Sequence, residues 1–172
     1  TISCWVRINS DDTNDGCIFD IGAGDLSLNW DTYSIKNYEI KLEGSTAGQS
    51  YTTGIEIGSW NHVVATYSGG SSGALRIYLN GTYNDVDTCT NPTGFLGARA
   101  TIGNRQDETR GFDGDICDLT VWDVDHSGGT IPNALWNNGI RVDPRTIVRE
   151  HMIAYWPLGA APGDDPTSIM HD

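Results

Sequence analysis

The sequence predicts an all-β fold, an antiparallel sandwich of two sheets, with one or two short helices near the C-terminus. Short apolar or alternating stretches recur about every ten residues between clusters of Gly, Asn, Asp and Ser, as in antiparallel strands joined by turns. Neither a heptad pattern nor an internal repeat interrupts this organisation. A chain of 172 residues suits one domain with a real core.

The first residues predict a central strand. Residues 1–8 alternate, and Trp5 faces away from the other large apolar side chains, so both faces of this strand are expected to be covered. The acid-rich residues 9–16 are interpreted as a solvated turn, because no helix flanks them and no Glu closes them, as a helix-loop-helix calcium loop requires. Further strands are expected at residues 17–21, 26–30, 38–42, 60–67 and 75–80.

The pair Asn80-Gly81 predicts a tight hairpin turn, because both residues tolerate positive φ. The same residues begin the glycosylation sequon Asn80-Gly81-Thr82, but the turn explains them without any sugar. Residues 83–97 are expected to form a looser segment.

Residues 101–122 are the centre of the functional interpretation. They read as a short strand (100–103), an acidic loop (104–114) and an alternating strand (115–122) whose Cys117, Leu119 and Val121 share one face. Oxygen side chains of the kind that hard cations bind gather in the loop, and these candidate metal ligands are Gln106, Asp107, Glu108 and Asp113.

The pattern changes after Trp122. Proline and capping residues predict short helices at residues 131–138 and 144–150, and residues 152–158 read as a closing strand. The sandwich is therefore expected to span residues 1–158, followed by a polar tail or linker at 159–172. Because the chain begins directly on a strand without an initiator Met, we expect it to be a piece of a longer polypeptide.

The charge of the chain narrows its partners. With 23 acidic and 10 basic side chains and a formal charge of −13, the chain offers no basic patch for phosphates, so neither nucleic acid nor an anionic membrane is an expected partner. No apolar run approaches the ~20 residues of a membrane helix. The four cysteines lack zinc-ribbon spacing, and their pairing into disulfides stays open.

The order of six segments resembles the laminin-G-like and pentraxin branch of the concanavalin-A-like jelly rolls. In chain order these segments are TISCWVR, SWNHVVATYSGG, LRIYLNG, ATIGN, GFDGDICDLTVWDVDHS, and LWNNG with AYWPL. A first strand usually precedes the TISCWVR segment in that family, so the resemblance implies that this strand is missing or lies upstream. The closing AYWPLGAAPGDDPTSIMHD is similar to the end of such domains in bacteriophage and virion proteins, which implies a virion or extracellular location.

The pentraxin resemblance implies calcium as a cofactor. A Glu-Gln-Asp run supplies ligands in that family, and Gln106 and Asp107 match it. Arg105 departs from the pattern, since it removes a carboxylate and adds a repelling charge, while Glu108, Asp113 and the more distant Asp20 are candidates to compensate. Pentraxins also pair a cysteine in a TxxC strand with one in an HxC strand. Cys4 matches the first, but Val64 stands at the second, so the resemblance implies no such bridge here.

Catalysis is not expected. Glucanases of this fold present two carboxylates as Glu-x-Asp-x-Glu, whereas the nearest run here, Asp113 to Asp118, contains no Glu. The four histidines have no Ser or Cys neighbour that would complete a triad, and His62 is interpreted as a structural imidazole. Four aromatic residues near turns are candidates for a sugar platform, with core packing as the alternative: Trp30, Tyr33, Tyr38 and Tyr51.

The sequence thus predicts a non-catalytic, lectin-like module of a phage or virion structural protein, a decoration, fibre or tail-associated domain. Its expected partners are a glycan or another cell-surface ligand, other virion or parent-protein chains, and a further copy of itself. Two alternatives remain: a purely structural assembly domain, and a secreted calcium-dependent pentraxin-like lectin.

Overall fold

The computed structural model describes residues 1–9, 16–21, 26–31, 39–44, 49–52, 54–70, 72–89 and 99–159, with the backbone alone for 26–31, 39–44, 49, 51 and 89. Its strands are β1 (Ile2–Ile8), β2 (Gly16–Ile21), β3 (Leu26–Asp31), β4 (Glu39–Gly44), β5 (Gln49–Tyr51), β6 (Trp60–Tyr67), β7 (Gly73–Leu79), β8 (Thr82–Cys89), β9 (Ala100–Ile102), β10 (Gly114–Trp122) and β11 (Met152–Trp156). Helices α1 (Thr130–Trp136), η1 (Asn137–Gly139) and α2 (Pro144–Ile147) precede the last strand.

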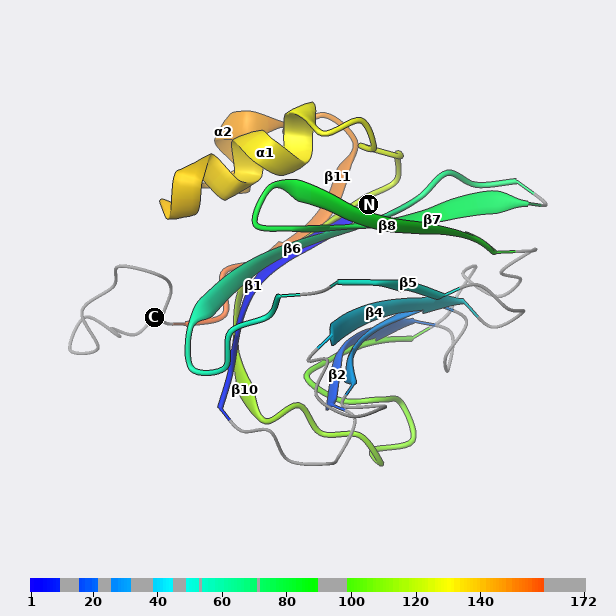
Figure 1. Ribbon diagram of the computed structural model, residues 1–172, viewed down its shortest axis with the longest axis vertical. Coiled ribbons are helices and arrows are strands. Elements are labelled where there is room, and N and C mark those ends of the chain that lie inside the picture. Colours follow the sequence, from blue (N-terminus) through cyan, green and yellow to red (C-terminus); the bar gives the residue numbers. More distant parts are fainter. Residues whose placement is uncertain are drawn as a thin grey trace.

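Two antiparallel sheets face each other (Figure 1). The larger sheet has the order β11-β10-β1-β6-β7-β8, and the smaller has the order β5-β4-β3-β2-β9. The predicted all-β sandwich with short helices near the C-terminus is confirmed. No helix in the described part of the chain is long and apolar enough to cross a membrane.

The main core lies between the sheets, and β1 crosses its centre. This strand pairs with β10 on one side and β6 on the other, which confirms the predicted central strand. Its even-numbered residues point inward because side chains alternate along a strand. The buried members of this core are Ile2, Cys4, Val6, Ile8, Ile18, Phe19, Ile55, Val63, Ala65, Leu75, Ile77, Leu79 and Leu119.

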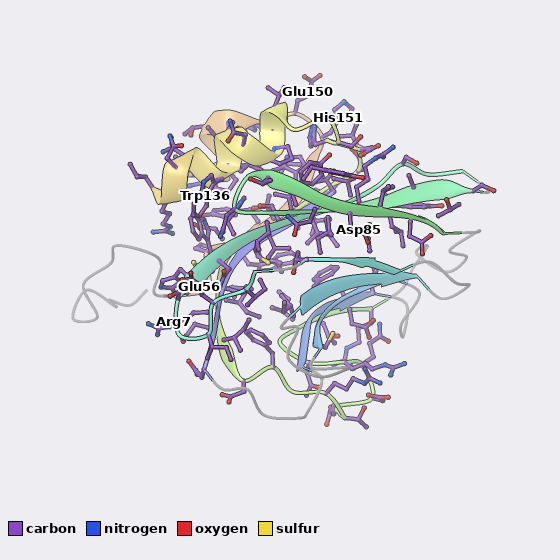
Figure 2. The ribbon with its side chains drawn as sticks, viewed as in Figure 1. Arg7, Glu56, Asp85, Trp136, Glu150 and His151 are labelled. Atoms are coloured by element: carbon purple, nitrogen blue, oxygen red, sulfur yellow. The ribbon has the colours of Figure 1, made fainter. Side chains whose placement is uncertain are left out.

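The helices cover the outer face of the larger sheet, on the side away from the smaller sheet (Figure 1). Val64, Tyr78 and Trp122 from the sheet pack against Leu135 of α1. Trp136 extends from α1 toward the sheet (Figure 2), where its ring centroid lies 5.2 Å from that of Trp5. Much of this face is therefore packed against the helices.

The alternation predicted for β10 is wrong at Cys117. Leu119 lies in the core between the sheets, whereas Cys117 packs with Trp5 on the opposite face. The cause is a bulge: Trp5 pairs with Cys117 but Ser3 pairs with Thr120, and Asp118 between them adopts a φ of 50°. An extra residue in one strand reverses the faces that follow it.

Part of the segment predicted to be loose, residues 83–97, is instead a regular strand. Residues 82–89 form β8, the edge strand that pairs with β7. Several of its side chains are exposed, among them Tyr83 and Val86, so the strand lacks the apolar alternation that reveals a buried one. The predicted hairpin before it is confirmed, because Asn80 and Gly81 join β7 to β8 with φ values of 50° and 75°.

Helix α2 ends at Ile147, three residues before the expected end, because Val148 is extended with a φ of −150°. Of the expected tail, only Gly159 belongs to the described residues.

Candidate functional site

The acidic loop after β9 is fixed to β2 by backbone and side-chain hydrogen bonds. Asp20 of β2 is buried and accepts a hydrogen bond from the backbone amide of Gln106 at 3.1 Å. The amide of Cys17 donates to the carbonyl of Arg110 at 3.0 Å. Inside the loop, Asn104 Oδ1 accepts from the amides of Arg105 at 2.8 Å and Arg110 at 3.1 Å. The loop is thus built as an extension of the smaller sheet.

Asp107 is engaged by its own loop. Its Oδ1 accepts hydrogen bonds from the hydroxyl of Thr109 at 2.5 Å and from the Thr109 amide at 3.1 Å. These bonds to Thr109 hold the pKa of Asp107 below its usual range. Arg105 Nε lies 3.8 Å from the other carboxylate oxygen. Arg105, which departs from the expected ligand run, therefore lies close to Asp107, one of the two residues that match it.

The other candidate ligands do not form a shell with Asp107. The side-chain amide of Gln106 donates to the carbonyl of Arg99. Glu108 is exposed on a turn with a φ of 61°, and Asp113 Oδ1 lies 3.5 Å from Asn9 Nδ2. Among the residues that the structure describes, no three His, Cys, Asp or Glu side chains are grouped to hold a metal ion. In this conformation the loop does not present roughly six oxygen ligands, and calcium binding stays a prediction.

The four candidate aromatic residues are only partly placed. Trp30 lies in β3, where it pairs with Ile40, and Tyr51 ends β5, where it pairs with Lys41. Tyr33 and Tyr38 fall outside the described residues. The sugar platform that these residues were expected to form stays a prediction.

A second polar centre lies around Asp118 at the bulge of β10. Its side chain is 2% exposed and accepts hydrogen bonds from Arg141 Nε at 2.6 Å and Nη2 at 3.0 Å. The hydroxyl of Tyr155 on β11 donates to Asp118 Oδ1 at 2.6 Å. Burial, followed by this contact with a carboxylate, raises the pKa of Tyr155 above its usual value. A buried carboxylate requires such partners, because an unpaired charge in the interior is costly.

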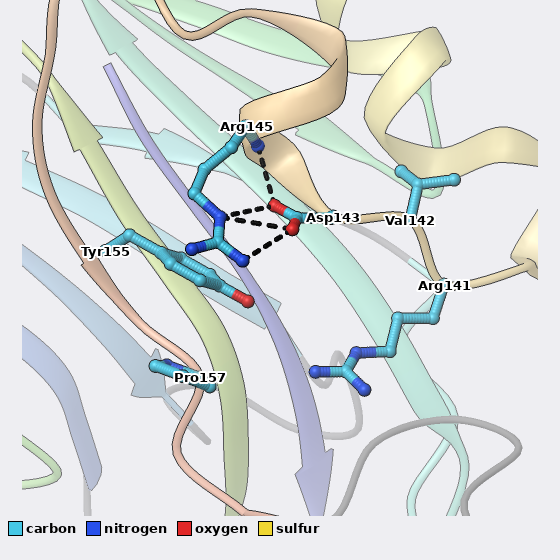
Figure 3. A pocket seen from close by; sticks show the side chains of 6 residues that line it. All are labelled: Arg141, Val142, Asp143, Arg145, Tyr155 and Pro157. Atoms are coloured by element: carbon cyan, nitrogen blue, oxygen red, sulfur yellow. Dashed lines mark hydrogen bonds and ion pairs between the residues drawn. The ribbon is translucent and has the colours of Figure 1, made fainter.

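An open pocket of about 610 Å³ lies beside this centre. It is lined by Arg141, Val142, Asp143, Arg145, Tyr155 and Pro157 (Figure 3), and we call it the Arg145 pocket. Asp143 caps α2 by accepting from the Arg145 amide at 2.9 Å, and its carboxylate also receives the Arg145 guanidinium, with Nη2 2.6 Å from Oδ2. The guanidinium carbon of Arg145 lies 4.9 Å from the centroid of the Tyr155 ring. The pocket thus combines fixed charged groups with an aromatic ring.

The sequence indicated little of this pocket. Only the cap formed by Asp143 and Pro144 was predicted, from the helix-start pattern. Nothing in the order of residues indicates that Arg141 returns to a carboxylate 23 positions earlier, since the bulge that turns Asp118 toward it leaves no periodic signal.

A match to a family model identifies the superfamily to which the chain belongs. Residues 1–131 match the Laminin_G_3 family model, described as the concanavalin A-like lectin/glucanases superfamily. The chain belongs to this superfamily. The matched residues include the acidic loop and Asp118, whereas α2, β11 and all the residues that line the Arg145 pocket lie beyond them. No curated protein sequence matches this concanavalin A-like domain significantly.

Solved structures share the fold. A candidate carbohydrate binding protein from Bacteroides ovatus aligns with a TM-score of 0.62 and 22% identity over 91% of this chain and 44% of its own. The heptameric SAP-like pentraxin from Limulus polyphemus aligns at 0.56 and 18%, over 91% and 78% of the two chains. Tailspike protein 2 from Escherichia coli O157:H7 bacteriophage CAB120 aligns at 0.60 and 14%, over 99% and 24%. At these identities the likeness is one of fold alone.

Proposed function

We propose that this domain is a non-catalytic, lectin-like module that binds a glycan and is part of a larger protein. The superfamily includes lectins and glucanases. The arginine and tyrosine partners of the carboxylates on β10 are the observation that favours a lectin over a glucanase. Asp115 accepts from Arg7 Nε at 2.9 Å, and Asp118 is held by Arg141 and Tyr155. A glycosidase needs one carboxylic acid and one carboxylate on either side of the scissile bond. Carboxylates neutralised by arginine favour the lectin.

A place in a virion or at a cell surface is the finer part of this proposal. The similarity of the closing segment to phage domains supports it, and so does the tailspike alignment, in which this domain corresponds to 24% of a longer chain. A domain that is a small part of a fibre or tailspike is suited to contact a surface glycan of the host. Other chains of the particle, or of the parent protein, are then its further partners.

Affinity electrophoresis through gels that contain single polysaccharides tests the binding function. The domain is expected to be retarded by at least one polysaccharide and to release no reducing ends from it during prolonged incubation. A mobility that no polysaccharide changes, together with blank glycan arrays, would dismiss the lectin proposal in favour of a structural assembly domain. Release of reducing ends would instead identify a hydrolase.

Self-association is the second candidate property, and the heptameric state of the aligned pentraxin favours testing it. Sedimentation velocity over a range of protein concentrations distinguishes a monomer from a closed ring, because the mass of a closed ring is one fixed multiple of the monomer mass. A strictly monomeric domain that is also absent from purified particles would contradict an assembly role.

A further inference from the structure

We infer that the Arg145 pocket, lined by residues 141–143, 145, 155 and 157, is the binding site for an uncharged saccharide. The inference rests on the proposed lectin function for the class of ligand and adds the site and its chemistry. At about 610 Å³ the pocket has room for a small ligand, within the range typical of ligand pockets. The residues that line it lie on the segment beyond the superfamily match.

The polar groups of the pocket are held in place before any ligand arrives. The Asp143 carboxylate is fixed from two directions, by the amide of Arg145 at the start of α2 and by the Arg145 guanidinium, with Nε 2.9 and 3.1 Å from its two oxygens. Tyr155 is fixed by its bond to the buried Asp118. A site whose side chains are already ordered loses little conformational entropy on binding. These groups suit hydroxyls, which donate to a carboxylate and accept from a guanidinium at once.

Charge balance argues for an uncharged ligand. Two arginines line the pocket, and each already has a carboxylate: Asp118 for Arg141 and Asp143 for Arg145. An anion would have to separate Arg145 from Asp143, and it would approach a chain with a formal charge of −13. A hydroxyl group joins the pair without breaking it. The balanced pairs therefore favour a sugar over a phosphate, sulfate or carboxylate.

The apolar part of the lining supports the same ligand class. Val142, Pro157 and the ring of Tyr155 lie among the charged groups (Figure 3). A pyranose ring presents hydroxyls around its edge and C–H groups on its faces, and the faces pack on aromatic and apolar side chains. The pocket thus offers both polar and apolar surface, which suits the recognition of a sugar.

The decisive experiment compares Arg145→Ala with Arg149→Ala. Arg149 is exposed in the same short segment and does not line the pocket, so both variants remove one charge from the same region. The probes are dextran, galactomannan and xyloglucan as neutral polymers and alginate as an anionic one, each in affinity gels. Arg145→Ala is expected to weaken neutral-polymer binding about tenfold, the loss typical of a charged hydrogen-bonding group. Arg149→Ala is expected to bind like the wild type, with equal Tm values in all three proteins.

A second variant, Asp143→Asn, separates the ligand classes. It keeps an oxygen that caps α2 but removes the charge that balances Arg145, so neutral-polymer binding is expected to fall while alginate binding rises. Retention by alginate alone in the wild type would overturn the uncharged-ligand assignment. Wild-type binding that Arg145→Ala leaves unchanged would overturn the site while the lectin function stands. A wild type that binds no polymer would overturn both.

Discussion

Asp118 and Arg141 join the β-sandwich to its C-terminal segment through a two-bonded ion pair. The carboxylate is 2% exposed, and the guanidinium reaches it from a loop that follows α1 and η1. Tyr155 of β11 adds a third bond to the same carboxylate. One side chain in the middle of β10 thus positions both arms of the Arg145 pocket, because Arg141 and Tyr155 line it.

Asp118→Ala is expected to destabilise the domain by about 3 kcal/mol, because it leaves Arg141 and the Tyr155 hydroxyl without their shared acceptor. Asp118→Asn is the matched control. Asparagine tolerates the φ of 50° at this bulge and keeps one oxygen for Tyr155, so its loss is expected to be smaller. Urea unfolding measures both. Equal losses for the two variants would mean that the carboxylate charge, which both remove, decides stability here, and that the oxygen kept by asparagine and its tolerance of positive φ contribute little.

His62 makes stability depend on acid pH. The side chain is buried beside Trp5 and Trp136, with Nε2 3.0 Å from Ser3 Oγ, and burial lowers its pKa from 6.5 to about 3. Below pH 6.5 the His62 imidazole binds a proton in the unfolded chain but not in the folded chain. Stability therefore falls as pH decreases from 6.5 toward 3, by about 1.4 kcal/mol for each pH unit.

His62→Gln removes this titration. The variant is expected to be less stable than the wild type at pH 7, because it loses the packing of the imidazole against the two indoles. The difference in unfolding free energy between the two proteins should shrink steadily from pH 6.5 to pH 4. Parallel stability curves over that interval would show that His62 does not titrate as its burial implies.

The turn at Gly81 sets the contact between the β7–β8 hairpin and α1. A Cβ at this position would lie 2.9 Å from Trp136 Cδ1, in addition to the cost of a φ of 75°. Gly81→Ala is expected to destabilise the domain by about 2 kcal/mol or more. Gly69→Ala is the control, because Gly69 has a φ of 77° and open space around its Cα. Thermal unfolding should show a larger loss of Tm for Gly81→Ala, and an equal loss would exclude the contact with Trp136.

The sequence predicted those parts of the fold that depend on local patterns. Strands such as β1 and β6 are covered on both faces and carry strong apolar signals, and Asn80-Gly81 specifies its turn through backbone preference alone. Strand β8 was missed because an edge strand needs no apolar alternation. The face of Cys117 was wrong because a single bulge residue, Asp118, reverses the alternation without a sequence signal.

The candidate site was less predictable than the fold for a physical reason. Resemblance placed the metal ligands in one loop, and the structure shows how Thr109 and Arg105 engage Asp107 there. The Arg145 pocket depends on long-range contacts: Asp118 and Tyr155 meet because β10 and β11 are neighbours, and Arg141 reaches Asp118 from the loop after η1. Contacts of this kind follow from topology and not from the spacing of residue types.

Calcium binding by the acidic loop remains open to a direct test. For Asp107 to become a ligand, it must either bind the ion through Oδ2, which Arg105 faces at 3.8 Å, or exchange the bonds of Oδ1 to Thr109 for the ion. If the loop binds calcium as the pentraxin resemblance implies, added calcium raises the Tm of the wild type by mass action, and Asp107→Ala abolishes that rise. Glu150→Ala, which removes an exposed carboxylate far from the loop (Figure 2), should leave it intact. A Tm that neither calcium nor chelator changes in any of the three proteins would dismiss the metal site.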